Sequence, residues 1–177
     1  MSANGSIHVY YGDGKGKTTA ALGLALRAAG FENNIVIVQF LKNWVCGEHI
    51  SLKHLPNIVL YQAKSVSGKF VSDMTDDEKL ETKVSQDECL KNALKLVESG
   101  RCDMLILDEA IDAYMLGVLD SELLKGLIIN KPESLELVVT GHNPDAWFLE
   151  RAAYVTEMKK HKHPYDVGMK ARRGIEF

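Results

Sequence analysis

Gly12-Asp13-Gly14-Lys15-Gly16-Lys17-Thr18-Thr19 is the stretch that decides the fold of this chain. It follows an apolar run and precedes a helical pattern, and its three glycines stand on alternate positions. Such a loop lets successive backbone N–H groups turn inward, while Lys17 supplies a point charge and the next helix directs its positive end to the same place. The stretch therefore predicts a cradle that binds a polyphosphate.

The spacing of this loop differs from the general P-loop pattern. That pattern has four residues between its first glycine and the Gly-Lys pair. Here three residues separate Gly12 from Gly16, and Tyr11 stands where the first glycine is expected. The tighter loop indicates an unusual relation between the loop and its triphosphate.

Apolar runs rich in β-branched residues recur along the chain and predict strands. They cover residues 7–11, 35–40, 58–61, 104–107, 135–141 and 154–158. Helical patterns stand between them, which indicates a doubly wound, mostly parallel α/β sheet around a P-loop (RecA-like) core.

Three helices have distinct signals at their starts. The segment 18–29 follows the loop and is apolar nearly all round, so we expect it to be largely buried. A long polar helix follows the capping box of Thr75 and Glu78 and ends near residue 100. A third helix is predicted to start at Asn143-Pro144, with asparagine as the cap and proline in the first position.

Composition bounds the function classes. With 177 residues, 46% of them hydrophobic, we expect one nucleotide-binding domain over residues 1–177. A net charge of -3 gives no general attraction to nucleic acid or to an anionic membrane, and no apolar run approaches the roughly 20 residues of a membrane span. The three cysteines are widely spaced, as suits a reducing compartment. We expect a cytoplasmic protein with small-molecule ligands and no nucleic-acid or membrane partner.

Asp108 and Glu109 are the candidate metal-binding residues. They end the apolar run 104–107, which we expect to form the strand next to the phosphate loop. Mg²⁺ takes hard oxygen ligands and keeps several waters, so a carboxylate, the Thr18 hydroxyl and phosphate oxygens would suffice. The alternative is that both carboxylates favour the dipole of a following helix.

Two further residues are candidates for nucleotide binding. Arg27 interrupts a run of small apolar residues after the loop, and is either a ligand contact or a surface arginine. His142 follows the run 135–141 at the sheet edge where open α/β folds bind ligands, and either contacts phosphate or is a polar loop residue.

The C-terminal segment 159–177 concentrates basic residues in an otherwise acidic chain. It is either a solvated tail or a segment that packs near the site and presents cations. The second interpretation rests on apolar residues interleaved with the charges, namely Tyr165, Met169, Ile175 and Phe177.

Taken together, these features resemble the ATP:corrinoid adenosyltransferase family of the P-loop type, which acts on cob(I)alamin or cob(I)yrinic acid a,c-diamide. The resemblance is carried by blocks that run in family order to the C-terminus: residues 12–21, 38–42, 107–109, 139–141, 155–158 and 163–177. A generic P-loop ATPase has no reason to carry the last block.

The resemblance implies transfer of the 5′-deoxyadenosyl group of ATP to Co(I) of a reduced corrinoid, with triphosphate as the leaving group. It implies that the loop with Lys17 holds triphosphate, that ATP lies reversed in the loop, that Thr18 and Glu109 hold Mg²⁺ or Mn²⁺, and that Asp108 supports them. It also implies a homodimer and a flavoprotein reductase as electron donor.

This chain departs from the family at two places, one of which is His142, where the family usually has arginine after Thr-Gly. Where members often carry Gly-Phe-Thr-Trp, the chain has Ser67-Gly68-Lys69-Phe70, which leaves Phe70 as the implied corrinoid contact. The alternatives to this function are a P-loop ATPase or small-molecule kinase that uses the γ-phosphate, and a non-catalytic sensor of ATP or corrinoid.

Overall fold

The computed structural model describes residues 4–42, 44–63 and 68–177. Residues 64–67, the start of the stretch that leads to Phe70, lie outside the described residues, as does Asn43. Six strands form one sheet in the order β3-β2-β4-β5-β1-β6, and each neighbouring pair is parallel. The strands are β1 Ile7–Tyr11, β2 Ile35–Gln39, β3 Ile58–Gln62, β4 Met104–Asp108, β5 Glu136–Gly141 and β6 Tyr154–Glu157. The predicted parallel α/β fold is confirmed.

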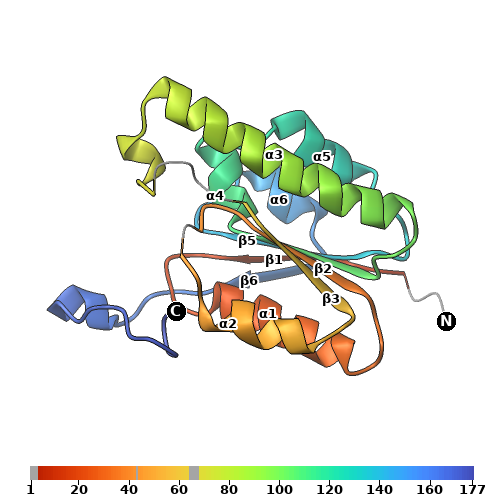
Figure 1. The fold of residues 1–177 in the computed structure, drawn as a ribbon, viewed down its shortest axis with the longest axis horizontal. Helices are drawn as coiled ribbons and strands as arrows, with labels where there is room; N and C mark the ends of the chain where they lie inside the picture. The colour runs from red at the N-terminus through yellow and green to blue at the C-terminus, as the bar shows by residue number, and fades with distance from the viewer. Residues whose placement is uncertain (1–3, 43, 64–67) are drawn as a thin grey trace.

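Helices cover both faces of the sheet (Figure 1). One face carries α1 Lys17–Ala29 and α2 Gly47–Ser51, and the other carries α3 Asp76–Glu98, α4 Ala110–Met115, α5 Ser121–Ile129 and α6 Ala146–Arg151. Three short 3-10 turns complete the chain: η1 Leu52–His54, η2 Val71–Asp73 and η3 Pro164–Val167. The Thr75 cap of α3 forms as predicted, because its side chain accepts from the Glu78 N–H and the Glu78 carboxylate accepts from the Thr75 N–H.

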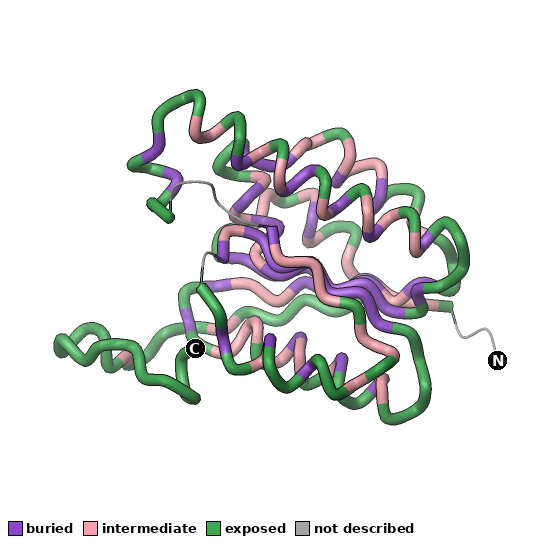
Figure 2. Tube along the Cα trace, viewed as in Figure 1, coloured by how far each residue is buried: buried purple, intermediate pink, exposed green. Residues whose placement is uncertain are grey.

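The sheet forms the centre of the core, as Figure 2 shows by its buried strands. Every residue of β2 and β4 is buried, which explains why their sequences are apolar without alternation. The prediction that α1 is largely buried is wrong. This helix buries a stripe of alanines, Ala21, Ala25 and Ala28, while Leu26 is 59% exposed.

One further prediction needs correction, the start of α6, while the placement of Asp108 does not. The strand that ends in Asp108 lies next to the phosphate loop as expected, since the Thr18 hydroxyl donates to Asp108 over 2.9 Å, although β5 stands between β4 and β1 in the sheet. The last helix begins at Ala146 after Asp145, rather than at Asn143-Pro144. Among the described residues, no helix is long and apolar enough to cross a membrane.

Candidate active site

The phosphate loop joins β1 to α1 and lies against the ends of two other strands. The Gly12 N–H donates to the His142 carbonyl over 3.0 Å, and the Gly14 N–H donates to the Met158 carbonyl over 2.6 Å. A Cβ atom on Gly14 would lie 2.6 Å from that Met158 oxygen, so a side chain there would clash with backbone. Gly12 adds a φ of 110°, a conformation that favours glycine. The loop therefore needs glycine at 12 and 14 for its own shape.

Lys17 lies across the loop that it follows. Its ammonium donates to the Gly12 carbonyl over 2.7 Å and to the Gly14 carbonyl over 3.1 Å. Burial lowers the pKa of Lys17, and the nearby carboxylates of Asp112 and Glu109 partly oppose this shift. The Lys17 ammonium is thus held against the backbone carbonyls of the loop.

Asp108 ends β4 and is a fully buried acceptor with donors from four parts of the chain. Its Oδ1 accepts from the Thr140 hydroxyl over 2.8 Å and from the Thr18 hydroxyl over 2.9 Å. Its Oδ2 accepts from Lys42 Nζ over 2.7 Å and from Gln39 Nε2 over 3.2 Å. A carboxylate with this many donors is well suited to orient its neighbours and has little capacity left to bind a cation directly.

Thr18 and Glu109 offer the oxygen atoms that remain. Since the Thr18 hydroxyl gives its proton to Asp108, the lone pairs of its oxygen are free to face a cation. Glu109 has a φ of 62°, an uncommon left-handed conformation for a residue with a side chain. Burial, followed by the nearby Asp108 charge, raises the pKa of Glu109 to about 7. A hydroxyl oxygen and a carboxylate whose negative charge is only partly offset by nearby cations suit a hard divalent cation.

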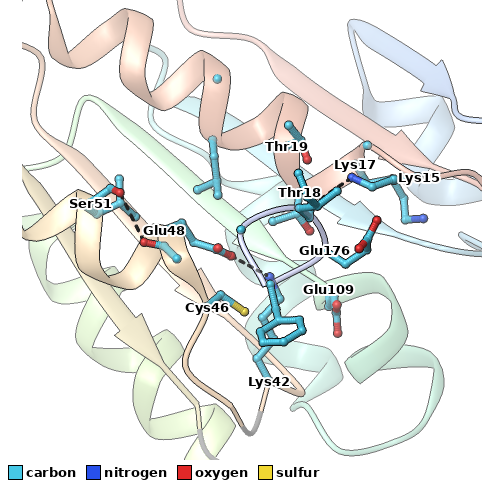
Figure 3. Close-up of a pocket in the computed structure, with 18 of the residues that line it drawn as sticks. Lys15, Lys17, Thr18, Thr19, Lys42, Cys46, Glu48, Ser51, Glu109 and Glu176 are labelled. Atoms are coloured by element: carbon cyan, nitrogen blue, oxygen red, sulfur yellow. Dashed lines mark hydrogen bonds and ion pairs between the residues drawn. The ribbon is translucent and has the colours of Figure 1, made fainter. Parts of the chain in front are cut away.

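A cavity of about 890 Å³ connects these groups (Figure 3). Residues 13–19 of the loop, Lys42, Glu109 and His142 line its polar side. The apolar wall faces it from α1 and η1 and consists of Leu22, Leu26, Leu52 and Leu55. The cavity thus combines an end lined by the glycine-rich loop and its lysines with an apolar surface.

The C-terminal segment reaches this cavity at two points. The Lys160 N–H donates to the Asp13 carboxylate over 2.9 Å, and Lys15 Nζ lies 3.5 Å from the Ile175 carbonyl. Ile175 and Phe177 line the cavity. All four of the expected apolar anchors are nevertheless exposed, from Phe177 at 37% to Tyr165 at 77%.

Comparison with known proteins identifies the family. The model of the family described as "ATP:corrinoid adenosyltransferase BtuR/CobO/CobP" matches residues 3–177. The chain belongs to this family. A corrinoid adenosyltransferase of Escherichia coli K12 is 33% identical over 174 residues, which cover 98% of this chain and 86% of that protein. A corrinoid adenosyltransferase of Pseudomonas aeruginosa is 31% identical, and the match covers 84% of that protein. One of Salmonella typhimurium is 30% identical, and the match covers 86% of that protein. Both matches cover 98% of this chain.

In this adenosyltransferase family member, most of the residues expected at the site lie together. Asp13 to Thr19, Glu109 and His142 all line the cavity. His142 is oriented by Asp112, whose carboxylate lies 3.0 Å from its Nδ1 and raises the pKa of the ring.

Two expected residues lie elsewhere. Arg27 is exposed in the last turn of α1 and is not among the described residues that line the cavity. Its exposure fits the second of the two interpretations, a surface arginine. Phe70 lies before η2, is 78% exposed and is likewise absent from the described cavity lining.

Other residues of this adenosyltransferase were not predicted at the site. Gln39, at the end of β2, and Lys42, on the segment that follows β2, both contact Asp108. Thr140 contacts Asp108 from β5. A glutamine at the end of an otherwise apolar strand is a signal that could have found Gln39, while Lys42 follows only from the pairing of β2 with β4.

Proposed function

We propose that this protein transfers the 5′-deoxyadenosyl group of ATP to the Co(I) centre of a reduced corrinoid, in adenosylcobalamin synthesis or salvage. The family that the chain belongs to carries this activity in its description. The observation that supports it in the molecule is a phosphate loop whose Lys17 shares one cavity with Thr18, Glu109 and an apolar wall. These surfaces match the charged and apolar halves of ATP.

The reaction needs no general base from the protein, because cobalt supplies the electron pair. Co(I) attacks the ribose C5′, a Co–C bond forms, and the C5′–O bond breaks with its electrons on the α-phosphate oxygen. Triphosphate leaves with one more negative charge than it had in ATP. The loop and Lys17 would stabilise this charge, which is an electrostatic contribution to catalysis. The shortened loop is compatible with a reversed ATP.

A divalent cation, Mg²⁺ or Mn²⁺, is part of the proposal. The Thr18 oxygen and the Glu109 carboxylate would hold it, and Asp108 would fix Thr18 through the hydrogen bond of 2.9 Å. Such a cation supplies neutralisation of phosphate charge. The role of the protein residues is to orient the triphosphate and keep the leaving oxygen near Lys17.

The decisive experiment separates the products. The protein is incubated with ATP, Mg²⁺ and chemically reduced cobalamin, and the Co(I) spectrum is followed. We expect its loss, a light-sensitive Co–C bond and one triphosphate per turnover. Persistence of Co(I) would overturn the proposal, ADP as product would favour a kinase or ATPase, and ATP binding without turnover would favour a sensor.

A matched pair of variants links the activity to the loop. Lys17→Ala is expected to lower the rate at least 100-fold, on the order of the loss of one transition-state donor. Lys91→Ala, which removes an exposed lysine of α3, serves as the control and should keep the wild-type rate. Equal rates for both variants would contradict the role of Lys17.

Phe70 remains the proposed corrinoid contact. Its exposed ring precedes η2, near the start of α3. Phe70→Ala should raise the KM for cobalamin and leave the KM for ATP unchanged. An unchanged KM for cobalamin would exclude this contact.

A homodimer and a flavoprotein reductase complete the proposal, and both rest on the family resemblance. Sedimentation velocity at micromolar concentration should show a dimer, and a monomer would contradict it. A reduced flavoprotein should replace the chemical reductant in the assay, and failure of all flavoproteins tested beside a working chemical reductant would count against such a partner.

A further inference from the structure

A buried chain of hydrogen bonds runs from α2 to Asp108, and its members beyond Asp108 have no role in the proposed function. We call it the relay, and it consists of His49, Gln39 and Asp108. His49 Nε2 lies 2.6 Å from Gln39 Oε1, and Gln39 Nε2 lies 3.2 Å from Asp108 Oδ2. All three side chains are buried. Gln39 and Asp108 are register partners of the adjacent strands β2 and β4, so the sheet itself brings them together.

The hydrogen-bond donors and acceptors of the relay can be assigned in only one way. The amide nitrogen of Gln39 faces two carboxylates, Asp108 and Glu48, the latter at 3.5 Å. Carboxylates accept hydrogen bonds, so this end of Gln39 must be the NH₂ group and its oxygen must face His49. His49 must therefore donate from Nε2. Its other nitrogen, Nδ1, accepts from the Cys46 N–H over 3.2 Å.

The two bonds of His49 require one neutral tautomer, because a charged ring would have a donor facing the Cys46 N–H. Burial lowers the pKa of His49, which agrees with a neutral ring. Of the nearby charged groups, Glu48 raises this pKa, and Lys42 and Lys53 lower it. The ring is therefore fixed in place at both nitrogens.

A metal site at this position is the competing interpretation. Ligand atoms of Cys46, Glu48 and His49 lie within 4.8 Å of one another. A metal needs an unprotonated ring nitrogen, and both nitrogens of His49 are already engaged. Glu48 is also paired with Lys42, whose Nζ is 3.7 Å from its carboxylate. The hydrogen-bonded network accounts for this cluster more fully than a cation does.

We propose that His49 is a positioning residue that acts on the nucleotide site through Gln39. By fixing the Gln39 amide, it keeps a donor on Asp108 Oδ2. Asp108 then stays oriented with Oδ1 toward the Thr18 hydroxyl, and the Thr18 oxygen stays turned to the cation that accompanies triphosphate. The inference rests on the proposed function for the identity of that ligand.

Two substitutions of His49 separate the relay from the local structure of α2. His49→Gln can place an amide donor near the position of Nε2 and so keep the bond to Gln39. His49→Asn can keep an acceptor for the Cys46 N–H but is too short to reach Gln39. If the proposal is right, H49N loses affinity for Mn²⁺ in the presence of ATP by about 10- to 100-fold, and H49Q retains most of it.

The measurement is Mn²⁺ binding by electron paramagnetic resonance with ATP present and no corrinoid. Equal affinities of the two variants, or a weaker H49Q, would assign His49 to the cap of α2 and overturn the proposal. The wild type reports separately on the proposed function, because it can bind Mn²⁺ and ATP and still fail to adenosylate cobalamin.

A third variant keeps the test decisive if H49N does not fold. Gln39→Met interrupts the relay while leaving His49 and its cap in place, and it should lose Mn²⁺ affinity to a similar extent. Wild-type affinity in Gln39→Met would overturn the proposal. Zn²⁺ titration addresses the competing interpretation, since one tightly bound Zn²⁺ per chain that Cys46→Ser removes would show a metal site and overturn the relay.

Discussion

Lys42 is the residue that compensates the buried charge of Asp108. Their side chains are 8% and 1% exposed and form an ion pair at 2.7 Å. Removal of the cation would leave an uncompensated carboxylate in the core, which is costly. We expect Lys42→Met to lower the free energy of unfolding by about 3 kcal/mol, measured by urea denaturation.

The control for Lys42 is a lysine without a buried partner. Lys91→Met makes the same substitution at an exposed position of α3 and should shift the free energy of unfolding by less than about 0.5 kcal/mol. A loss in Lys42→Met no larger than that would show that Asp108 needs no ion pair.

Glu109 gives the molecule a pH dependence. Its pKa rises from 4.5 to about 7 on folding, because burial and Asp108 disfavour its ionised form. The folded protein therefore binds this proton more tightly than the unfolded chain, and stability falls as pH rises from about 4.5 to 7. Glu109→Gln removes this trend.

We expect the stability of Glu109→Gln relative to wild type to increase by about 3 kcal/mol between pH 4.5 and pH 8, in metal-free buffer with a chelator. Urea denaturation at several pH values measures it. Parallel stability curves for the two proteins would show that Glu109 is not perturbed in the folded state.

The phosphate loop depends on the strand end that it packs against. A Cβ atom on Gly14 would meet the Met158 oxygen at 2.6 Å and the Met158 carbonyl carbon at 2.8 Å, both of them backbone atoms. Gly14→Ala should therefore cost about 1–3 kcal/mol of stability and weaken ATP binding, measured by urea denaturation and calorimetry.

Gly126→Ala is the matched control, because it makes the same change in the interior of α5 with no atom within 4 Å of the new Cβ. It should stabilise the protein by about 0.5–1 kcal/mol and leave ATP binding unchanged. Similar effects of the two alanines would contradict a specific contact at Gly14.

The predicted elements differ in how local their signals are. The strands were predictable because runs such as 35–39 and 104–108 are apolar on both faces, a pattern set by neighbouring residues. The predicted start of α6 is wrong, because Asn143 and Pro144 carry strong helix-start preferences that the turn before Asp145 overrides. The exposure of α1 could not be predicted, because Leu22 and Leu26 face a cavity that other segments form.

In the molecule as a whole, the C-terminal segment lines one side of the cavity that we propose to hold ATP. Ile175 lies near Lys15, and Glu176 pairs with Arg172 at 3.0 Å in a compact turn (Figure 3 shows Glu176 beside the loop lysines). Deletion of residues 172–177 should raise the KM for ATP several-fold. It should leave the melting temperature nearly unchanged, because these residues are exposed and bury little apolar surface.

Steady-state kinetics and thermal melting of the shortened chain measure the two effects. A melting temperature that falls with an unchanged KM would show that the segment supports the fold and not the nucleotide site.

The sequence by itself determined the parallel α/β architecture and the family, and it predicted the phosphate cradle. Glycine spacing, capping and hydrophobic period act over a few residues, so they can be read along the chain. Only the tertiary structure decided that β5 separates β1 from β4, that Arg27 lies away from the cavity, and that Lys42, Gln39 and Thr140 surround Asp108. These contacts join residues 32 to 69 positions apart, and they arise from the order in which the strands pair, which no local pattern encodes.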